Sequence, residues 1–291
     1  MLTLLGQLFV DGIAMGMVYV ILAAGIVFIM SITGIFYIAY GQFYMVGAFA
    51  TWAGVTLLKL PFVLALGMGV GLTVVMGVLS YVLIFQYTTY SAQKFMATIV
   101  AAIGLMLILS QTGFIMFGSQ ARSIPVLFPG VLNVAGINVT FDKLFLLIVS
   151  LVTILLLFLF YEKTRIGRAM KATSFNTDAS ALQGINTKGI CLIATAIGCG
   201  LAGFAGGLIA PGYGIVPEMG QNVISIVFLI AMFGGIDSLL GAVFGGLVVG
   251  LILSFGQYYF GAYSQILVFA IVGIIIVFKP GGLLGSRELD I

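Results

Sequence analysis

The stretch EKTRIGRAMKATSFNTDASALQGINTK, residues 162–188, has the highest concentration of charged residues in this chain. It lies between two long apolar runs and holds five of the eleven basic residues, namely Lys163, Arg165, Arg168, Lys171 and Lys188. Because Lys and Arg next to membrane spans stay on the cytoplasmic side, this stretch predicts the orientation of everything around it. It is also the region polar enough to meet a soluble partner.

Composition places the rest of the chain in a membrane. Hydrophobic residues make up 62% of the 291 residues and charged residues 7%, whereas charged residues are about 25% of a soluble domain. Apolar runs of about 18 residues or more recur along the chain, each enough to cross a hydrocarbon core as a helix. We therefore expect one all-α, polytopic membrane domain over residues 1–291. The net charge of +3 comes from few residues and gives no reason to expect nucleic-acid binding.

The apolar runs predict about eight or nine transmembrane helices, some of them interrupted or half-spanning. The expected segments are 8–32, 39–58, 62–87, 95–117, 144–161, 189–210, 222–236, 238–256 and 263–279. Segment 222–236 is short and ends in two glycines, and the stretch from Gly34 to Gln42 is broken in a similar way. Such interruptions are where transporters expose backbone to a cavity.

Loop charges predict the topology. With residues 162–188 in the cytoplasm, alternating crossings place eight basic residues inside and three outside. The inside set is Lys94, Lys163, Arg165, Arg168, Lys171, Lys188, Lys279 and Arg287, and the outside set is Lys59, Arg122 and Lys143. This asymmetry predicts nine crossings, with the N-terminus outside, the C-terminus inside and an outer loop at 118–143.

Glycine spacing predicts close packing between helices. Glycines four residues apart share one helix face and let a second backbone approach, and the pairs are Gly67 with Gly71, Gly203 with Gly207, Gly241 with Gly245 and Gly246 with Gly250. The glycine-rich starts of 34–48 and 234–250 also hint at an inverted repeat.

Enzymatic chemistry has few residues to use. The chain has no His and no glycine-rich loop ending in Gly-Lys, so we expect no catalysis, no metal site and no cofactor bound by this chain. Uphill transport would then draw on an ion gradient or on a partner ATPase. The acidic residues lie at predicted span ends or in loops, which disfavours ion coupling through a buried carboxylate. Backbone carbonyls can hold sodium, so a gradient-driven carrier or channel that acts alone remains an alternative. A membrane scaffold with no transport role is disfavoured by the interrupted segments.

A short helix is expected inside the charged stretch. Asn176 can cap its start, Asp178 suits its first turn, and Gly184 can end it, which defines a helix over 177–183. Ala179, Leu182 and Ile185 give this helix a small apolar stripe. A helix this short needs a surface to dock on. That surface is either a partner ATPase or lipid, with Arg165, Arg168 and Lys171 meeting anionic headgroups in the second case.

Candidates for a solute pathway are polar residues close to the glycine-rich or interrupted segments. They are Tyr37, Tyr40, Gln42, Thr195, Gln221, Asn222 and Asp237.

Several motifs resemble one known family. RIGRAMKATSFNTDASALQGIN (165–186), Ala194, Gly198 and GLAGFAGGLIAP (200–211) look like the permease subunits of branched-chain amino-acid importers of the ATP-binding cassette (ABC) type. The likeness extends to IGLMLILSQTGFIMFGS (103–119), Gly234-Gly235 and SLLGAVFGGLVVG (238–250), and so covers essentially the whole chain.

The resemblance implies a multi-pass protein of the bacterial cytoplasmic (inner) membrane. It also implies a coupling helix that fits a groove on an ATPase. It implies docking-loop roles for Ala172, Asn176, Ala179, Leu182, Gly184, Ile185 and Asn186. It also implies partners, namely two ABC ATPase subunits that use ATP and Mg²⁺, a second permease subunit in a homo- or heterodimer, and a periplasmic or lipid-anchored solute-binding protein.

Departures from the family pattern affect the substrate. Where relatives usually have Asn, Ala-His-Gly and an acidic residue, this chain has Tyr37, Ala39-Tyr40-Gly41 and Gln42. Asp237 replaces a usual glycine, and Ser254 replaces a common acidic residue. The expected solute is a branched-chain amino acid or a related small polar solute, with urea and short amides as the alternative.

Overall fold

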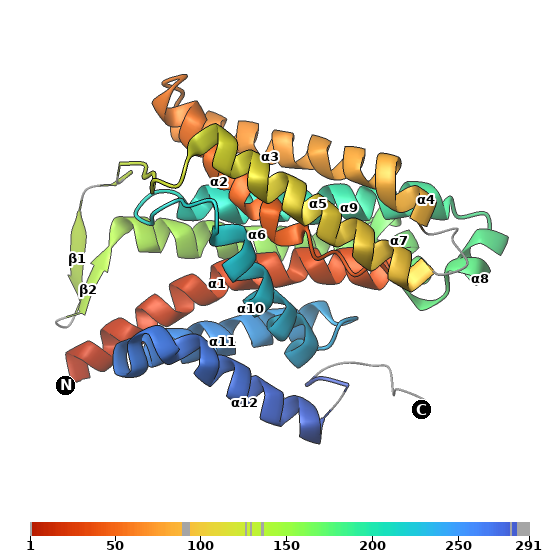
Figure 1. The fold of residues 1–291 in the computed structure, drawn as a ribbon. Coiled ribbons are helices and arrows are strands. Elements are labelled where there is room, and N and C mark those ends of the chain that lie inside the picture. The colour runs from red at the N-terminus through yellow and green to blue at the C-terminus, as the bar shows by residue number, and fades with distance from the viewer. Residues whose placement is uncertain are drawn as a thin grey trace. The chain divides into compact units, whose positions relative to one another are not determined.

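The computed structural model describes residues 2–88, 94–125, 127–128, 130–134, 137–279 and 281–283 (Figure 1). Within these ranges the chain is helical apart from its connections and one two-stranded hairpin. Its helices are α1 (Leu2–Thr33), α2 (Tyr40–Thr56), α3 (Phe62–Ser80), α4 (Gln86–Thr88), α5 (Lys94–Phe117), α6 (Phe141–Lys163), α7 (Arg165–Phe175), α8 (Thr177–Leu182), α9 (Thr187–Ile209), α10 (Met219–Gly234), α11 (Leu239–Phe260) and α12 (Ser264–Phe278). A π-helical turn, Tyr81–Phe85, joins α3 to α4, and a 3₁₀ turn, Gly261–Tyr263, joins α11 to α12. Arg287, part of the topology prediction, lies outside the described residues.

Each of the nine predicted apolar segments lies on a helix, so the helical polytopic class is confirmed. Among the described residues, six helical stretches are long and apolar enough to cross a membrane. They are Thr3–Thr33, Phe62–Thr88, Phe95–Phe117, Phe141–Lys163, Thr187–Ile209 and Leu239–Phe260. Helices α10 and α12 are apolar but shorter, and α2 has only 17 residues.

Two elements were absent from the prediction. The outer loop contains a hairpin of β1 (Val131–Val134) and β2 (Ile137–Thr140), paired antiparallel with Val131 opposite Thr140. The all-α expectation therefore needs this small correction. Helix α7 is the second missed element, and Thr164 begins it by accepting a hydrogen bond from the Gly167 backbone N–H at 2.9 Å.

The chain forms two compact units. The first comprises Met1–Val27, Pro125–Leu155 and Ile226–Ile291, and the second comprises Phe28–Ile124 and Leu156–Ser225. The core of the second unit is the three-helix contact of α2, α3 and α9. Glycines let these helices approach closely. A Cβ added to Gly206 would collide with the Tyr44 carbonyl, one added to Gly203 would collide with the Thr73 side chain, and one added to Gly47 would collide with the Gly203 backbone.

Glycines also join the helices of the first unit. An added Cβ on Gly250 would meet the Gly16 backbone on α1, and one on Gly241 would meet the Gly234 backbone on α10. Predicted close packing is thus confirmed at Gly203, Gly207, Gly241, Gly245, Gly246 and Gly250.

The packing prediction is wrong for Gly67 and Gly71. A Cβ added to either glycine would have nothing within 4 Å among the described residues. The buried face of α3 is the one that carries Gly69, Thr73 and Gly77, and the other two glycines lie off that face. Spacing identifies a shared face but does not say which face is covered.

Candidate functional site

Helix α2 begins inside the protein because a non-helical stretch follows α1. Gly34 has a φ of +66°, a conformation that suits glycine, and residues 34–39 are not helical. Thr33 supports the break, since its hydroxyl donates to the Ile29 carbonyl at 2.6 Å and accepts from the Ile35 N–H at 3.1 Å. The predicted interruption is therefore confirmed. Its consequence is that the first turn of α2, including the polar Gln42, is buried.

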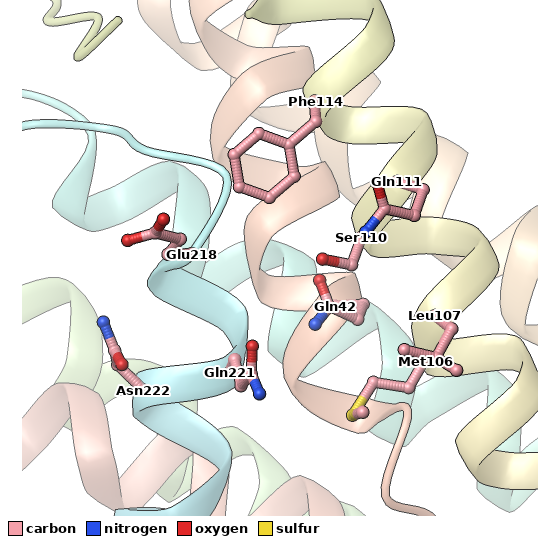
Figure 2. Close-up of a pocket in the computed structure, with 9 residues that line it drawn as sticks. All are labelled: Gln42, Met106, Leu107, Ser110, Gln111, Phe114, Glu218, Gln221 and Asn222. Carbon is pink, nitrogen blue, oxygen red and sulfur yellow. The ribbon is translucent and has the colours of Figure 1, made fainter. Parts of the chain in front are cut away.

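A cavity of about 280 Å³ opens beside this first turn, within the second unit (Figure 2). Three helices line it: α2, α5 and the start of α10. The lining residues are Gln42, Met106, Leu107, Ser110, Gln111, Phe114, Glu218, Gln221 and Asn222. Figure 2 shows the Gln42 amide between Ser110 on α5 and Gln221 on α10. The lining combines amide and hydroxyl groups with an apolar side, which is the usual make-up of a small-molecule site.

Two glycines bring the starts of α2 and α10 together at this cavity. A Cβ added to Gly41 would collide with the Gly220 carbonyl, and a Cβ on Gly220 would lie 2.6 Å from the Gly41 carbonyl oxygen and 2.9 Å from Gln42 Oε1. The side chain of Gln42 is 1% exposed, and its Oε1 has no hydrogen-bond partner among the described residues. An unsatisfied buried acceptor is uncommon in a folded protein.

Three of the seven predicted pathway residues share the cavity lining, namely Gln42, Gln221 and Asn222. Three others are buried in the same unit but do not line the cavity: Tyr37, Tyr40 and Thr195. The Tyr37 hydroxyl pairs with Ser80 Oγ at 2.5 Å, and Thr195 Oγ1 donates to the Cys191 carbonyl at 2.9 Å. Asp237 lies in the first unit, in the turn between α10 and α11.

Sequence reasoning missed three polar residues of the cavity, namely Ser110 and Gln111 on α5 and Glu218 just before α10. Ser110 and Gln111, followed by Thr112, form a polar run in the middle of a mostly apolar helix, and that run was a signal available in the sequence. Glu218 was placed only at a span end. It precedes α10, and its backbone carbonyl accepts from the N–H groups of Gln221 and Asn222 at 3.1 and 3.2 Å.

The charged stretch folds into a helix pair, α7 and α8. Asn176 separates them in an extended conformation, and its Oδ1 accepts from the N–H groups of Asp178 and Ala179 at 3.0 and 2.9 Å. At the other end Gly184 has a φ of +83°, and the Ile185 N–H donates to the Ser180 carbonyl at 3.1 Å. This is a Schellman cap. The predicted short helix and both of its caps are confirmed.

The exposed surface of the α7–α8 pair carries apolar side chains. Leu182 is 90% exposed and Phe175 is 69% exposed, while Ile185 is half-buried. Ala179, Arg165 and Arg168 are exposed and Ala172 is half-buried. Lys171 pairs with Glu162 at 3.1 Å.

The pair is fixed directly to the next long helix. Asn186 accepts a hydrogen bond from the Gly189 N–H at 3.1 Å and so caps α9. We call residues 165–186 the coupling segment.

Comparison with known proteins gives a consistent result. Residues 8–278 match the sequence profile of a family described as the permease component of branched-chain amino acid transport systems. The chain is 27% identical to BraD of Pseudomonas aeruginosa, a permease protein of a high-affinity branched-chain amino acid transport system, with 98% of this chain and 97% of BraD covered. It is 27% identical, over the same shares, to LivH of Escherichia coli, which carries the same description. A structure titled PsaBC from Streptococcus pneumoniae in complex with Fab aligns at a TM-score of 0.49 and 15% identity, over 94% of this chain and 89% of that one.

Proposed function

We propose a transport function on the premise that this chain belongs to the family of permease components of branched-chain amino acid transport systems. It is the membrane-spanning subunit of an ABC importer that moves a branched-chain amino acid, or a related small polar solute, into the cell. It performs no catalysis of its own. Two separate ATPase subunits supply the energy, a second permease subunit completes the pathway, and a solute-binding protein delivers the solute from outside.

The observation that carries this proposal is the coupling segment. Helix α8 has six residues, capped at both ends, and its Leu182 side chain is 90% exposed. A helix this short is unstable alone, so it needs to pack against another surface. The apolar stripe of Ala179 and Leu182 on α8, together with the exposed Arg165 and Arg168 on α7, suits a groove on a soluble protein. The same residues could rest on lipid, and the experiment below separates the two surfaces.

The proposed topology has nine crossings, with the N-terminus outside and the C-terminus inside. Two contacts support the outer placement. Lys143 and Asp11 pair at 2.6 Å, and both were assigned outside or at an outer span end. Arg122 of the outer loop exchanges two backbone hydrogen bonds, of 2.9 and 2.7 Å, with Ile215 in the connection that the same topology puts outside. The short α2 and α10 are the candidates for partial crossings. The inverted repeat stays a prediction.

A charge change on the coupling segment tests the proposal. In a variant with Ala179→Asp and Leu182→Asp, we expect the ATPase subunits to be lost on copurification from membranes, because two desolvated carboxylates oppose docking. The matched control is Val131→Asp with Leu132→Asp, which places the same charges on exposed positions of the outer hairpin and should leave copurification unchanged. Normal copurification of the Ala179/Leu182 variant would refute ATPase docking through α8 and favour the lipid surface.

Reconstitution separates the importer from a carrier that acts alone. We expect the complex in liposomes to take up L-leucine only when ATP is supplied on the ATPase side. Uptake by the isolated chain that follows an imposed ion gradient would support the gradient-driven alternative instead. Urea as a competing solute distinguishes the amino acid from the short-amide alternative.

A further inference from the structure

We propose that the cavity between α2, α5 and α10 is a binding subsite for the N–H donor group of a small amphipathic solute, with Gln42 Oε1 as its acceptor. The permease itself then discriminates against solutes that carry only negative charge. This inference rests on the proposed transport function and assigns a recognition step to this chain.

The first argument is the unmet hydrogen bond of Gln42. Its Oε1 is buried without a partner in the described part of the chain, and leaving such an acceptor unpaired costs about 1–3 kcal/mol. The neighbouring backbone donors are in use, since the N–H groups of Gln221 and Asn222 both donate to the Glu218 carbonyl. The described chain therefore gives Gln42 Oε1 no hydrogen-bond partner in this structure, and a molecule inside the cavity can supply the donor. An ammonium or amide N–H of a solute supplies it.

The second argument is the charge of the lining. Among the described residues that line the cavity, Glu218 is the ionisable one, and none is Lys or Arg. Glu218 directly precedes α10, so its carboxylate offsets the positive end of that helix dipole. In Figure 2 its carboxylate is turned away from Gln42. As a lining residue it gives the cavity a negative potential, favourable to cations and unfavourable to anions.

The third argument is the apolar side and the size. Met106, Leu107 and Phe114, all on α5, face the polar groups of α2 and α10 across the cavity. A volume of about 280 Å³ lies just below the usual range of small-molecule sites. The cavity therefore suits a small solute with an N–H head group and a compact hydrocarbon part.

Competition binding tests the subsite directly. Permease and ATPase subunits are assembled in nanodiscs without the solute-binding protein, and radiolabelled L-leucine is displaced by three probes: 3-methylbutylamine, which keeps the ammonium, 4-methylpentanoate, which keeps the carboxylate, and urea. We expect 3-methylbutylamine to compete about tenfold or more better than 4-methylpentanoate, because only the amine donates to Gln42. Urea should compete weakly, since it has no hydrocarbon part. Equal competition by the amine and the carboxylate, or no saturable binding of either ammonium compound, overturns the proposal.

Variants of Gln42 give a second readout. Gln42→Met removes the acceptor at similar volume, so we expect about tenfold weaker L-leucine binding and loss of the preference for the amine. Gln42→Glu keeps an acceptor oxygen and should retain that preference. Gln257→Met, at an exposed position of α11 that is not part of the cavity lining, is the matched control and should bind like the wild type. Unchanged binding by Gln42→Met, in protein that elutes as the intact complex, would contradict the assignment.

These results separate the subsite from the transport function. ATP-driven uptake with no preference among the probes removes the subsite and leaves the proposed function intact. A clear preference without ATP-driven uptake does the reverse.

Discussion

The caps of α8 give a quantitative prediction for ATPase docking. Asn176 holds two backbone N–H groups at the start of the helix, and replacing such a cap by Ala costs about 1 kcal/mol. Gly184 ends the helix at a φ of +83°, where any residue with a Cβ costs about 1–2 kcal/mol more than glycine. The two positions are eight residues apart, about 12 Å along a helix, so their effects should add. The double variant Asn176→Ala with Gly184→Ala should therefore lose about 2–3 kcal/mol of local helix stability.

We expect almost all of this lost α8 stability to appear as a loss of binding free energy for the ATPase subunits. A six-residue helix has little stability to spare, so the fraction of permease with α8 formed falls with each destabilising change. The apparent Kd rises as that fraction falls, and about 2–3 kcal/mol corresponds to roughly 30- to 160-fold. The assay is the affinity of the ATPase subunits for permease in nanodiscs, measured by biolayer interferometry.

Two controls make the docking prediction specific. Asn176→Asp replaces the amide by a carboxylate whose oxygen can accept the same two hydrogen bonds, so this variant should bind the ATPase within about twofold of the wild type. Asn133→Ala changes the same residue type on the outer hairpin and should have no effect on affinity. The reasoning is wrong if the double variant binds the ATPase as tightly as the wild type, because docking would then not need an ordered α8.

Three other predictions follow from the fold and the topology. Gly206→Leu should prevent stable assembly, because its side chain meets backbone atoms that cannot move aside, while Gly67→Leu, in open space, should not; fluorescence-detected size-exclusion chromatography compares them. Asp11→Asn should lower thermal stability by no more than about 1 kcal/mol, since its ion pair with Lys143 is partly exposed, and a double-mutant cycle with the lysine measures that coupling. A Leu182→Cys variant should react with a membrane-impermeant maleimide only from the cytoplasmic side, where the proposed topology places α8. Both native cysteines are buried, so the label should report on the new thiol. Labelling of intact cells would contradict the proposed orientation.

Local signals predicted α8 and both of its caps. Asn176 and Gly184 each act through their own backbone neighbours, so a sequence is enough to place a cap at each end of α8. Helix α7 was missed although Thr164 carries the same kind of capping signal. Arg165 and Arg168 were interpreted only as part of a charged cytoplasmic stretch, although an amphipathic helix also carries its charges on one face.

The cavity was predicted only in part, and the reason is physical. It combines residues near positions 42, 110 and 220, and their meeting depends on how three helices pack. In a helix that is apolar on all sides, periodicity does not tell which face is covered by protein. Gln42 and Gln221 were found because polar residues are costly inside a membrane and so stand out. The helix packing predicted for Gly67 and Gly71 was wrong. A glycine has no comparable energetic cost in a membrane, so glycine spacing does not show which helix face is covered by protein.

The coupling segment and the cavity are connected through rigid contacts within one unit. Asn186 caps α9 at the end of the coupling segment, and α9 packs on α2 through Gly203 against Gly47 and through Gly206 against the Tyr44 carbonyl. These contacts join backbone to backbone, so no flexible side chain lies between the helices to absorb a shift. Helix α2 begins at the cavity and carries Gln42. A displacement of α9 by a docked ATPase must therefore move α2 with it, and that movement reaches the acceptor atom of the proposed subsite.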